Sequence, residues 1–188
     1  MIGVKERRGT APTLCALNDS VAATGMNLAF HPLRSNCLDR LSAEDEQLLL
    51  ENARVLLDTA PSRTCALLAG KNIGLLCAHN ELARLFRGAA EGLGARVALI
   101  RPGLSPDSDP VVVRDTARML ARLYDAIECR DVPRELVRRL GEEADVPVYD
   151  AISSPAHPTA ALARMLPHGP GDSGRLSIVQ ALLLSTIR

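Results

Sequence analysis

The feature that most constrains the fold of this chain is a regular alternation of short apolar strands with amphipathic helices between residues 72 and 166. Strands that alternate with helices of this length predict a parallel sheet joined by right-handed crossovers. The sequence therefore predicts a single α/β domain with a four-stranded parallel sheet flanked by helices. Its strands are expected at 72–78, 95–101, 125–130 and 146–152, and its helices at about 80–93, 110–124, 133–144 and 157–166.

Two further signals in the sequence indicate where the first helix begins and which strand lies at an edge of the sheet. Ser42, followed by Glu44 and Asp45, is a capping-box-like helix start, and apolar residues then recur at helical spacing until Pro61 ends the run. Pro147 has no backbone N–H to donate to a neighbouring strand. We therefore expect a leading helix before the first strand, and an edge or entry position for the strand that contains Pro147.

Length and composition describe a neutral globular protein. A chain of 188 residues is long enough for one domain with a proper core and too short for two of ordinary size. Lys+Arg and Asp+Glu number 22 each and 47% of the residues are apolar, which argues against a nucleic-acid partner and against disorder. Residues 1–26 lack sustained periodicity and are expected to form a flexible arm, which leaves residues 27–188 for the domain.

The cysteines and the length of the apolar runs indicate the cellular location that we expect for the chain. The five cysteines are odd in number, lie far apart and form no C-x-x-C pair with nearby histidines, so we expect reduced thiols and a cytoplasmic location. We expect neither a structural metal nor a cofactor. No apolar run approaches the roughly 20 residues that span a bilayer, so no membrane association is expected.

A candidate ligand site follows from the predicted sheet, because ligands of such sheets bind beyond the carboxyl ends of the strands. Four loops meet at this rim of the sheet and offer polar and charged side chains. The candidate binding residues in these loops are His79, Asn80, Arg84, Ser105, Asp107, Asp109, Ser153 and Ser154, and the candidate catalytic residues are Glu81, Arg130 and His157. We expect the partner at this rim to be a small-molecule substrate.

Several segments resemble the carbamoyl-phosphate domain of the aspartate and ornithine carbamoyltransferases. They are the runs 67–74, 115–120, 146–148 and 157–163, within a similarity that covers roughly residues 38–166. The segment 174–187 resembles the final helix of the family, which in full-length members returns to pack on the first domain. The resemblance implies that a short connection replaces the second, amino-acid-binding domain.

The resemblance also implies a change at the phosphate-binding turn. The family places Ser-Thr-Arg-Thr there, and counting back from Phe86, which matches a family phenylalanine, these positions fall on His79, Asn80, Glu81 and Leu82. A charge-assisted contact of this kind contributes on the order of 1.5–3 kcal/mol, and a carboxylate in place of the guanidinium repels a phosphate dianion. We therefore expect carbamoyl phosphate to bind poorly.

Other positions that contact substrate in the family are kept. Arg130 matches the arginine after the third strand, and His157 begins the match to the motif His-Pro-Cys-Gln, in which the histidine and the arginine contact the carbamoyl oxygen. Thr159 and Ala160 replace the Cys and the Gln. The loop at 103–113 corresponds to the family loop that enters the site of a neighbouring subunit, and here it is acidic. By resemblance, the chain is expected to form a homotrimer.

The candidate residues also have purely structural interpretations. These are an N-cap for Asn80 and a helix start for His157, an ion pair for Arg130, a favourable helix-dipole position for Glu81, and turn formation for Asp107 and Asp109. The two cysteines at strand ends, Cys77 and Cys129, are expected to be small buried groups rather than nucleophiles.

Three functions remain open. The first is a repurposed enzyme that binds a neutral or cationic small molecule at a subunit-interface cleft, where Arg130 polarises a carbonyl and His157 or Glu81 moves a proton. A cyclisation, elimination or isomerisation in specialised-metabolite biosynthesis would fit. The second is a non-catalytic scaffold or regulatory pseudoenzyme. The third is residual carbamoyl transfer, in which a group such as Arg84 replaces the lost arginine. The sequence favours the first.

Overall fold

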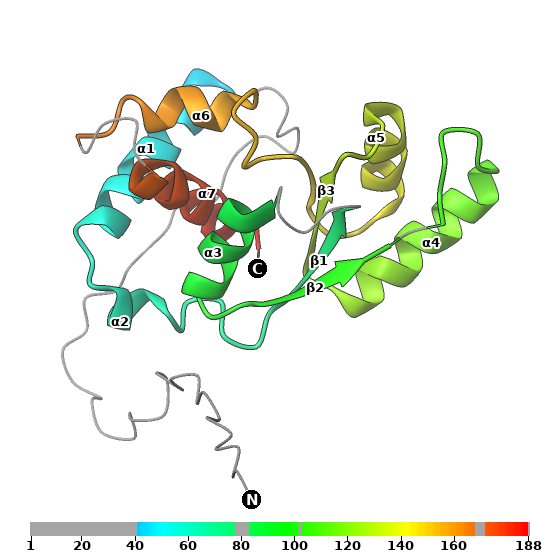
Figure 1. Cartoon of the computed structure of the whole chain (residues 1–188), viewed down its shortest axis with the longest axis horizontal. Helices are drawn as coiled ribbons and strands as arrows, with labels where there is room; N and C mark the ends of the chain where they lie inside the picture. The colour runs from blue at the N-terminus through cyan, green and yellow to red at the C-terminus, as the bar shows by residue number, and fades with distance from the viewer. Residues whose placement is uncertain (1–40, 78–82, 102, 168–171, 188) are drawn as a thin grey trace, which may run out of the picture.

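The computed structural model describes residues 41–77, 83–101, 103–167 and 172–187, and it contains the expected four-stranded parallel sheet (Figure 1). The strands lie in the order β2-β1-β3-β4, and each neighbouring pair is parallel. Their bounds are β1 (Asn72–Cys77), β2 (Arg96–Ile100), β3 (Ala126–Arg130) and β4 (Val148–Asp150). The predicted fold class is confirmed, whereas the expected arm at 1–26 lies outside the described residues.

Helices connect the strands and frame the domain. They are α1 (Ala43–Leu57), α2 (Pro61–Thr64), α3 (Arg84–Gly92), α4 (Pro110–Leu123), α5 (Arg134–Glu143), α6 (Pro158–Ala163) and α7 (Asp172–Thr186). The predicted cap of the leading helix is confirmed, because the Ser42 side chain accepts a hydrogen bond from the Asp45 amide at 3.1 Å. The short helix α2 was not predicted; it begins at Pro61, whose fixed φ and missing N–H suit the first helical position.

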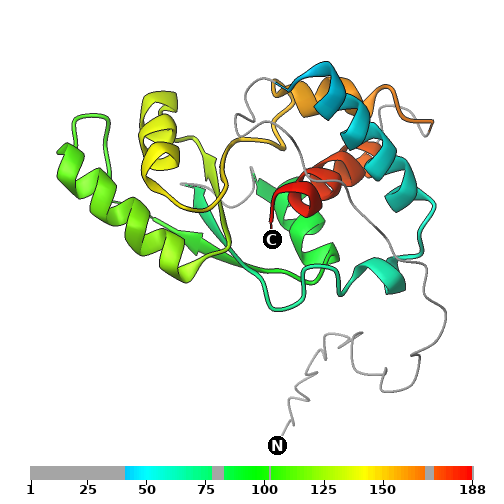
Figure 2. The ribbon, with the colours of Figure 1, turned by 180° about the vertical axis from the view of Figure 1, so that it is seen from behind.

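The helices cover the two faces of the sheet unequally (Figures 1 and 2). Alternate residues of a strand point to opposite faces. Leu76 and Ile127 accordingly pack in the core under α4 and α5, whereas Ile73, Leu75 and Tyr149 belong to the larger core under α1, α3, α6 and α7. The sheet is therefore the middle layer of three.

The final helix α7 is an integral part of the larger core. Its residues Ile178, Leu182 and Leu183 are completely buried, and the helix packs on α1, α3 and α6. A buried hydrogen bond from Asn52 Nδ2 to Ser185 Oγ, 3.1 Å long, joins α7 to α1. The final helix that the family resemblance implied is thus present, and it covers the side of the sheet on which α3 lies.

Two element boundaries differ from the prediction. Helix α3 begins at Arg84, about four residues later than expected, so Asn80 is not its N-cap; Ala83 holds that position without a side-chain hydrogen bond. Strand β4 is shorter than 146–152 because Pro147 precedes it and Ala151, with φ of 51°, leaves the extended conformation. The prediction of an edge strand after Pro147 is confirmed, since among the described residues β4 pairs with β3 alone.

The structure also tests the expectations for the two strand-end cysteines and for membrane-spanning segments. Cys77 and Cys129 are buried, as expected, and burial raises the pKa of Cys129, with further upward contributions from Glu128 and Asp150. A thiol of this kind is a poor nucleophile. Across the residues that the structure describes, the helices are too short or too polar to cross a bilayer.

Candidate functional site

The carboxyl ends of the four parallel strands define one rim, as predicted. The candidates His79, Asn80 and Glu81 follow β1 and lie outside the described residues. Arg84 is placed as the first residue of α3 and is exposed. It carries a positive charge at a helix start, a position where the helix dipole favours negative charge.

The loop between β2 and α4 carries Ser105, Asp107 and Asp109, all of them exposed. The Asp109 carboxylate accepts a hydrogen bond from the Val111 amide at 2.7 Å and so caps α4. The Ser105 amide donates to Ser108 Oγ at 2.8 Å. Asp109 thus has a structural role, as the N-cap of α4 rather than as the turn former that was expected.

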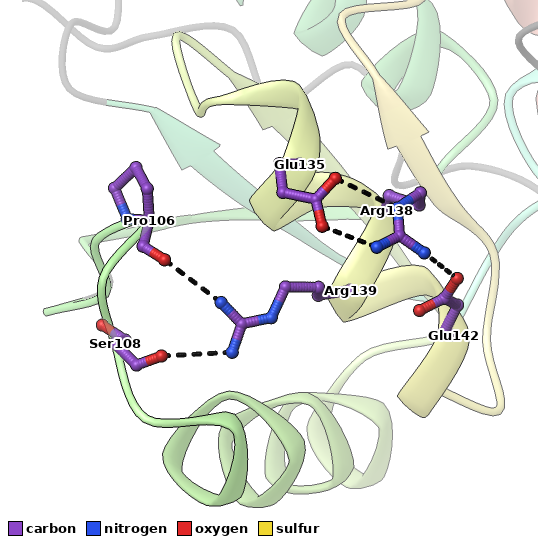
Figure 3. Close-up of polar contacts among 6 residues, drawn as sticks. All are labelled: Pro106, Ser108, Glu135, Arg138, Arg139 and Glu142. Atoms are coloured by element: carbon purple, nitrogen blue, oxygen red, sulfur yellow. Dashed lines mark hydrogen bonds and ion pairs between the residues drawn. The ribbon is translucent and has the colours of Figure 1, made fainter.

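Arg139 of α5 holds this loop from the neighbouring element. Its two terminal nitrogens donate to the carbonyl oxygens of Pro106 and Ser108, at 3.2 and 3.1 Å. Figure 3 shows Arg139 reaching across to the loop, whereas the adjacent Arg138 turns to Glu135 and Glu142 on its own helix. The shape of the acidic loop thus depends on an arginine that the sequence did not single out.

Arg130, Ser153 and Arg175 form a cluster at the ends of β3 and β4, which we call the arginine cluster. The Arg130 Nη2 donates to Ser153 Oγ at 2.8 Å, and the Arg175 Nη2 donates to the Ser153 carbonyl oxygen at 2.7 Å. Ser153 is buried, and both arginines are half-buried. Two guanidinium groups from distant parts of the chain therefore meet on one residue of the β4–α6 loop.

Arg175 belongs to the arginine cluster but was not among the candidates from the sequence. It lies in the first turn of α7, within the segment whose resemblance to the final family helix was noted without assigning any residue a role. The signal that could have found it is a lone arginine in the otherwise uncharged run 173–187. Long charged side chains remain in such positions when their heads find polar partners.

His157 is placed at the start of α6, as its structural interpretation predicted. Its side chain caps the helix, with Nδ1 accepting from the Thr159 amide at 3.3 Å and lying 3.0 Å from Thr159 Oγ1. Thr159 Oγ1 in turn donates to the Ile152 carbonyl oxygen at 2.6 Å. Nδ1 of His157 thus helps to hold the β4–α6 loop in place.

The backbone at the arginine cluster is unusual. Asp131, directly after β3, and Ala151, directly after β4, have φ of 57° and 51°, a region that non-glycine residues rarely occupy. Ser154, half-buried, donates its amide to the Ala151 carbonyl oxygen at 2.8 Å and accepts from the Ala156 amide at 3.4 Å. Such backbone strain gathers at functional sites.

Glu128 lies on β3, two residues before Arg130, and is completely buried. It was not among the candidate residues, because a glutamate within a strand gives no sequence signal of burial. Burial raises the pKa of Glu128 well above its usual range, while Arg130 acts in the opposite direction. The rim therefore combines two guanidinium groups with one buried acid.

Comparisons with known proteins agree with this geometry. Residues 36–167, well over half of the chain, match the model of the aspartate/ornithine carbamoyltransferase carbamoyl-phosphate-binding domain. The ornithine carbamoyltransferase from Pyrococcus furiosus is 27% identical, with a TM-score of 0.56 over 73% of this chain and 44% of that one. The enzyme from Thermus thermophilus is 30% identical, with a TM-score of 0.52 over 65% of this chain and 42% of that one.

The same fold is found in more distant structures. The anabolic ornithine carbamoyltransferase from Campylobacter jejuni superposes with a TM-score of 0.55 at 22% identity, over 72% of this chain and 43% of that one. The chain thus spans less than half the length of the solved structures named here. The matched residues and the shared fold establish that the chain belongs to the aspartate/ornithine carbamoyltransferase family through its carbamoyl-phosphate-binding domain.

Proposed function

We propose that this chain is a repurposed family member that binds and transforms a neutral or cationic small molecule at the strand-end rim and does not transfer carbamoyl groups. The observation that carries the proposal is the contrast between two parts of the rim. The arginine cluster offers guanidinium donors to a ligand oxygen, whereas His79, Asn80 and Glu81 stand where the family grips phosphate. Donors of this kind stabilise charge that develops on a carbonyl oxygen.

His157 and Glu81 are the proposed proton-transfer groups. The Nδ1 capping contact of His157 fixes the orientation of the ring at the rim, and an imidazole is a common proton-transfer group near neutral pH. Asp107, exposed in the acidic loop, and its neighbour Asp109 favour a ligand with a positive group. A cyclisation, elimination or isomerisation needs only these elements, whereas transfer to an amino acid would need a second substrate site.

We also propose that the site lies at a subunit interface of a homotrimer. Exposed apolar side chains support this proposal: Val112, Met119 and Leu123 lie along one side of α4, with fractional exposures of 51, 53 and 58%. Leu99 of the edge strand β2 is exposed as well. Apolar surface gathered on one element is typical of an interaction site. A cytoplasmic location remains a prediction from the sequence.

The central test compares the natural chain with a variant in which the family motif is restored. Isothermal titration with carbamoyl phosphate at millimolar concentration should give no heat of binding for the natural chain. The combined variant His79→Ser, Asn80→Thr, Glu81→Arg and Leu82→Thr should gain binding, because hydroxyl and guanidinium groups then face the dianion. Binding to the natural chain with millimolar or higher affinity would revive carbamoyl transfer and overturn the proposal.

The second candidate function is a non-catalytic scaffold for another enzyme, which the exposed apolar side of α4 favours. The two functions make different predictions for His157→Ala. In an enzyme this variant loses turnover of an identified substrate while it keeps binding of the substrate. In a scaffold the variant leaves complex formation unchanged, because His157 does not lie on α4.

A further inference from the structure

The strongest unexplained feature of the molecule is the carboxyl group of Glu128. Its side chain is 0% exposed, and within the described residues neither of its oxygens makes a hydrogen bond of normal geometry. The amide of Ile152 lies near enough to favour the charged form, without reaching that geometry. The Nε of Arg130 is also buried without a hydrogen-bond partner in this part of the chain. Native proteins rarely leave such groups unpaired, so each needs an explanation.

The position of Glu128 links it to the arginine cluster. Residues two apart on a strand point to the same face, so Glu128 lies under Arg130, about 6.6 Å away along β3. On either side in the sheet, Glu128 is flanked by its register partners Leu75 and Tyr149, both members of the larger core. An apolar residue would satisfy these neighbours better than an acid. Glu128 is therefore not explained by packing.

The surroundings of Glu128 favour its uncharged form. Desolvation is the largest influence and raises its pKa well above the usual range; Arg130 lowers it and Asp150 raises it further. The other titratable groups that interact with it are Tyr149 and Cys129, whose own pKa values are raised first by burial and then by Glu128. Of these groups, Arg130 is the only cation, and it shares the Glu128 face of the strand.

The charge state of Glu128 decides the net charge of the region around the arginine cluster. With Glu128 neutral, the guanidinium charge of Arg130 is not balanced by the acid beneath it, and Arg175 brings a second positive charge to Ser153. We propose that the arginine cluster binds a carboxylate group of the ligand, and that Glu128 is the specificity-determining residue that permits this by remaining uncharged. This inference rests on the proposed function, because it assigns the ligand group that binds at the same rim. Since the ligand is proposed to be neutral or cationic overall, it must also carry a positive group that balances its carboxylate.

The expected behaviour is a coupling between ligand and proton. A bound carboxylate places a negative charge near Glu128 and thereby disfavours the ionised form of the acid. The complex therefore keeps Glu128 protonated at pH values at which the free protein loses this proton. Binding should therefore weaken by about tenfold for each pH unit above the Glu128 pKa of the free protein. A neutral carbonyl group would show no such dependence, because it brings no charge.

The test uses two probes of the same shape, propionate and propionamide, followed by NMR titration of the full chain. Propionate should bind more tightly than propionamide at mildly acidic pH and lose its advantage as the pH rises. The matched variant Glu128→Gln keeps the size of the side chain but cannot ionise, so it should bind propionate without the loss at high pH. A Glu128→Gln profile that falls with pH like that of the natural chain would overturn the proposal.

The remaining outcomes separate this inference from the proposed function. If propionamide binds and propionate does not, the rim is a carbonyl site and only the carboxylate assignment fails. If neither binds, the arginine cluster is not a ligand site, and both proposals fail. A measurement without ligand gives an independent check: the ¹³C carboxyl signal of Glu128 should titrate at a higher pH in Arg130→Met than in the natural chain. An unchanged titration would show that the acid and the guanidinium are not coupled, and would also overturn the inference.

Discussion

Two glycines with nearly the same backbone conformation provide a sharp test of the fold. Gly70 precedes β1 with φ of 84°, and Gly94 precedes β2 with φ of 89°. The turns that contain them lie side by side, because the Leu68 amide donates to the Leu93 carbonyl oxygen at 2.7 Å. A Cβ added at Gly94 would lie 2.2 Å from the Cys65 carbonyl oxygen, whereas one added at Gly70 meets nothing within 4 Å. The two alanine variants therefore differ only in the steric contact.

The expected losses of stability follow from two costs, the left-handed backbone conformation at both glycines and the steric contact at Gly94. An alanine in the left-handed region costs roughly 1–2 kcal/mol, and both variants incur this cost. Gly94→Ala also places a methyl group against a backbone oxygen, which cannot move aside as a flexible side chain can, and overpacking of this kind adds about 1–3 kcal/mol. We expect Gly70→Ala to reduce the free energy of unfolding by about 1–2 kcal/mol and Gly94→Ala by about 2–5 kcal/mol.

Urea unfolding followed by circular dichroism measures both values, and the slope of the transition shows whether the variants still unfold in one cooperative step. Gly103→Ala serves as a second control, because a Cβ there also meets nothing within 4 Å and no left-handed φ is involved. Equal destabilisation by Gly70→Ala and Gly94→Ala would refute the reasoning, since it would mean that the close approach to Cys65 relaxes at no cost.

Three further predictions concern the loop, the assembly and the buried acid. Arg139→Ala should speed amide hydrogen exchange in the loop at 103–109 and cost about 1–2 kcal/mol, whereas Arg138→Ala, which removes only exposed ion pairs, should leave that exchange unchanged. Met119→Glu on α4 should lower the mass measured by light scattering from trimer to monomer, and Met165→Glu, which is also exposed but lies beyond α6, should not. Because the folded pKa of Glu128 is raised, the native state holds its proton where the unfolded chain releases it, so stability falls as pH rises from the unfolded to the folded pKa. Glu128→Gln should abolish that fall, so its advantage over the natural chain in denaturant unfolding grows with pH; a constant difference would contradict the assignment.

The agreement between prediction and structure is closest where a local pattern carries the information. The alternation of apolar strands and helices predicted the sheet because the period of a strand or a helix is a property of neighbouring residues. The Ser42 cap and the edge position after Pro147 were predictable for the same reason: each depends on a side chain and a backbone group close in sequence. The start of α3 was wrong by about four residues because no side chain caps it.

The candidate site was predicted less completely than the fold. The rim followed from strand direction, and the structure brings Arg130 and Ser153 together there at 2.8 Å. Asp109 and His157 proved to cap helices. The end of β4 at Ala151 was missed because its left-handed conformation is not marked by a glycine.

The sequence by itself determined the order of the elements and which face of each is apolar. That His79–Leu82 replace the phosphate-binding residues of the family remains a prediction from the resemblance. The tertiary structure alone decided which distant side chains meet: Arg175 of α7 reaches Ser153 beside Arg130, and Glu128 becomes buried because β1, β4 and the core packed on them enclose it. The physical reason is that periodicity encodes the direction of a side chain relative to its own element, whereas its surroundings depend on how separate elements pack.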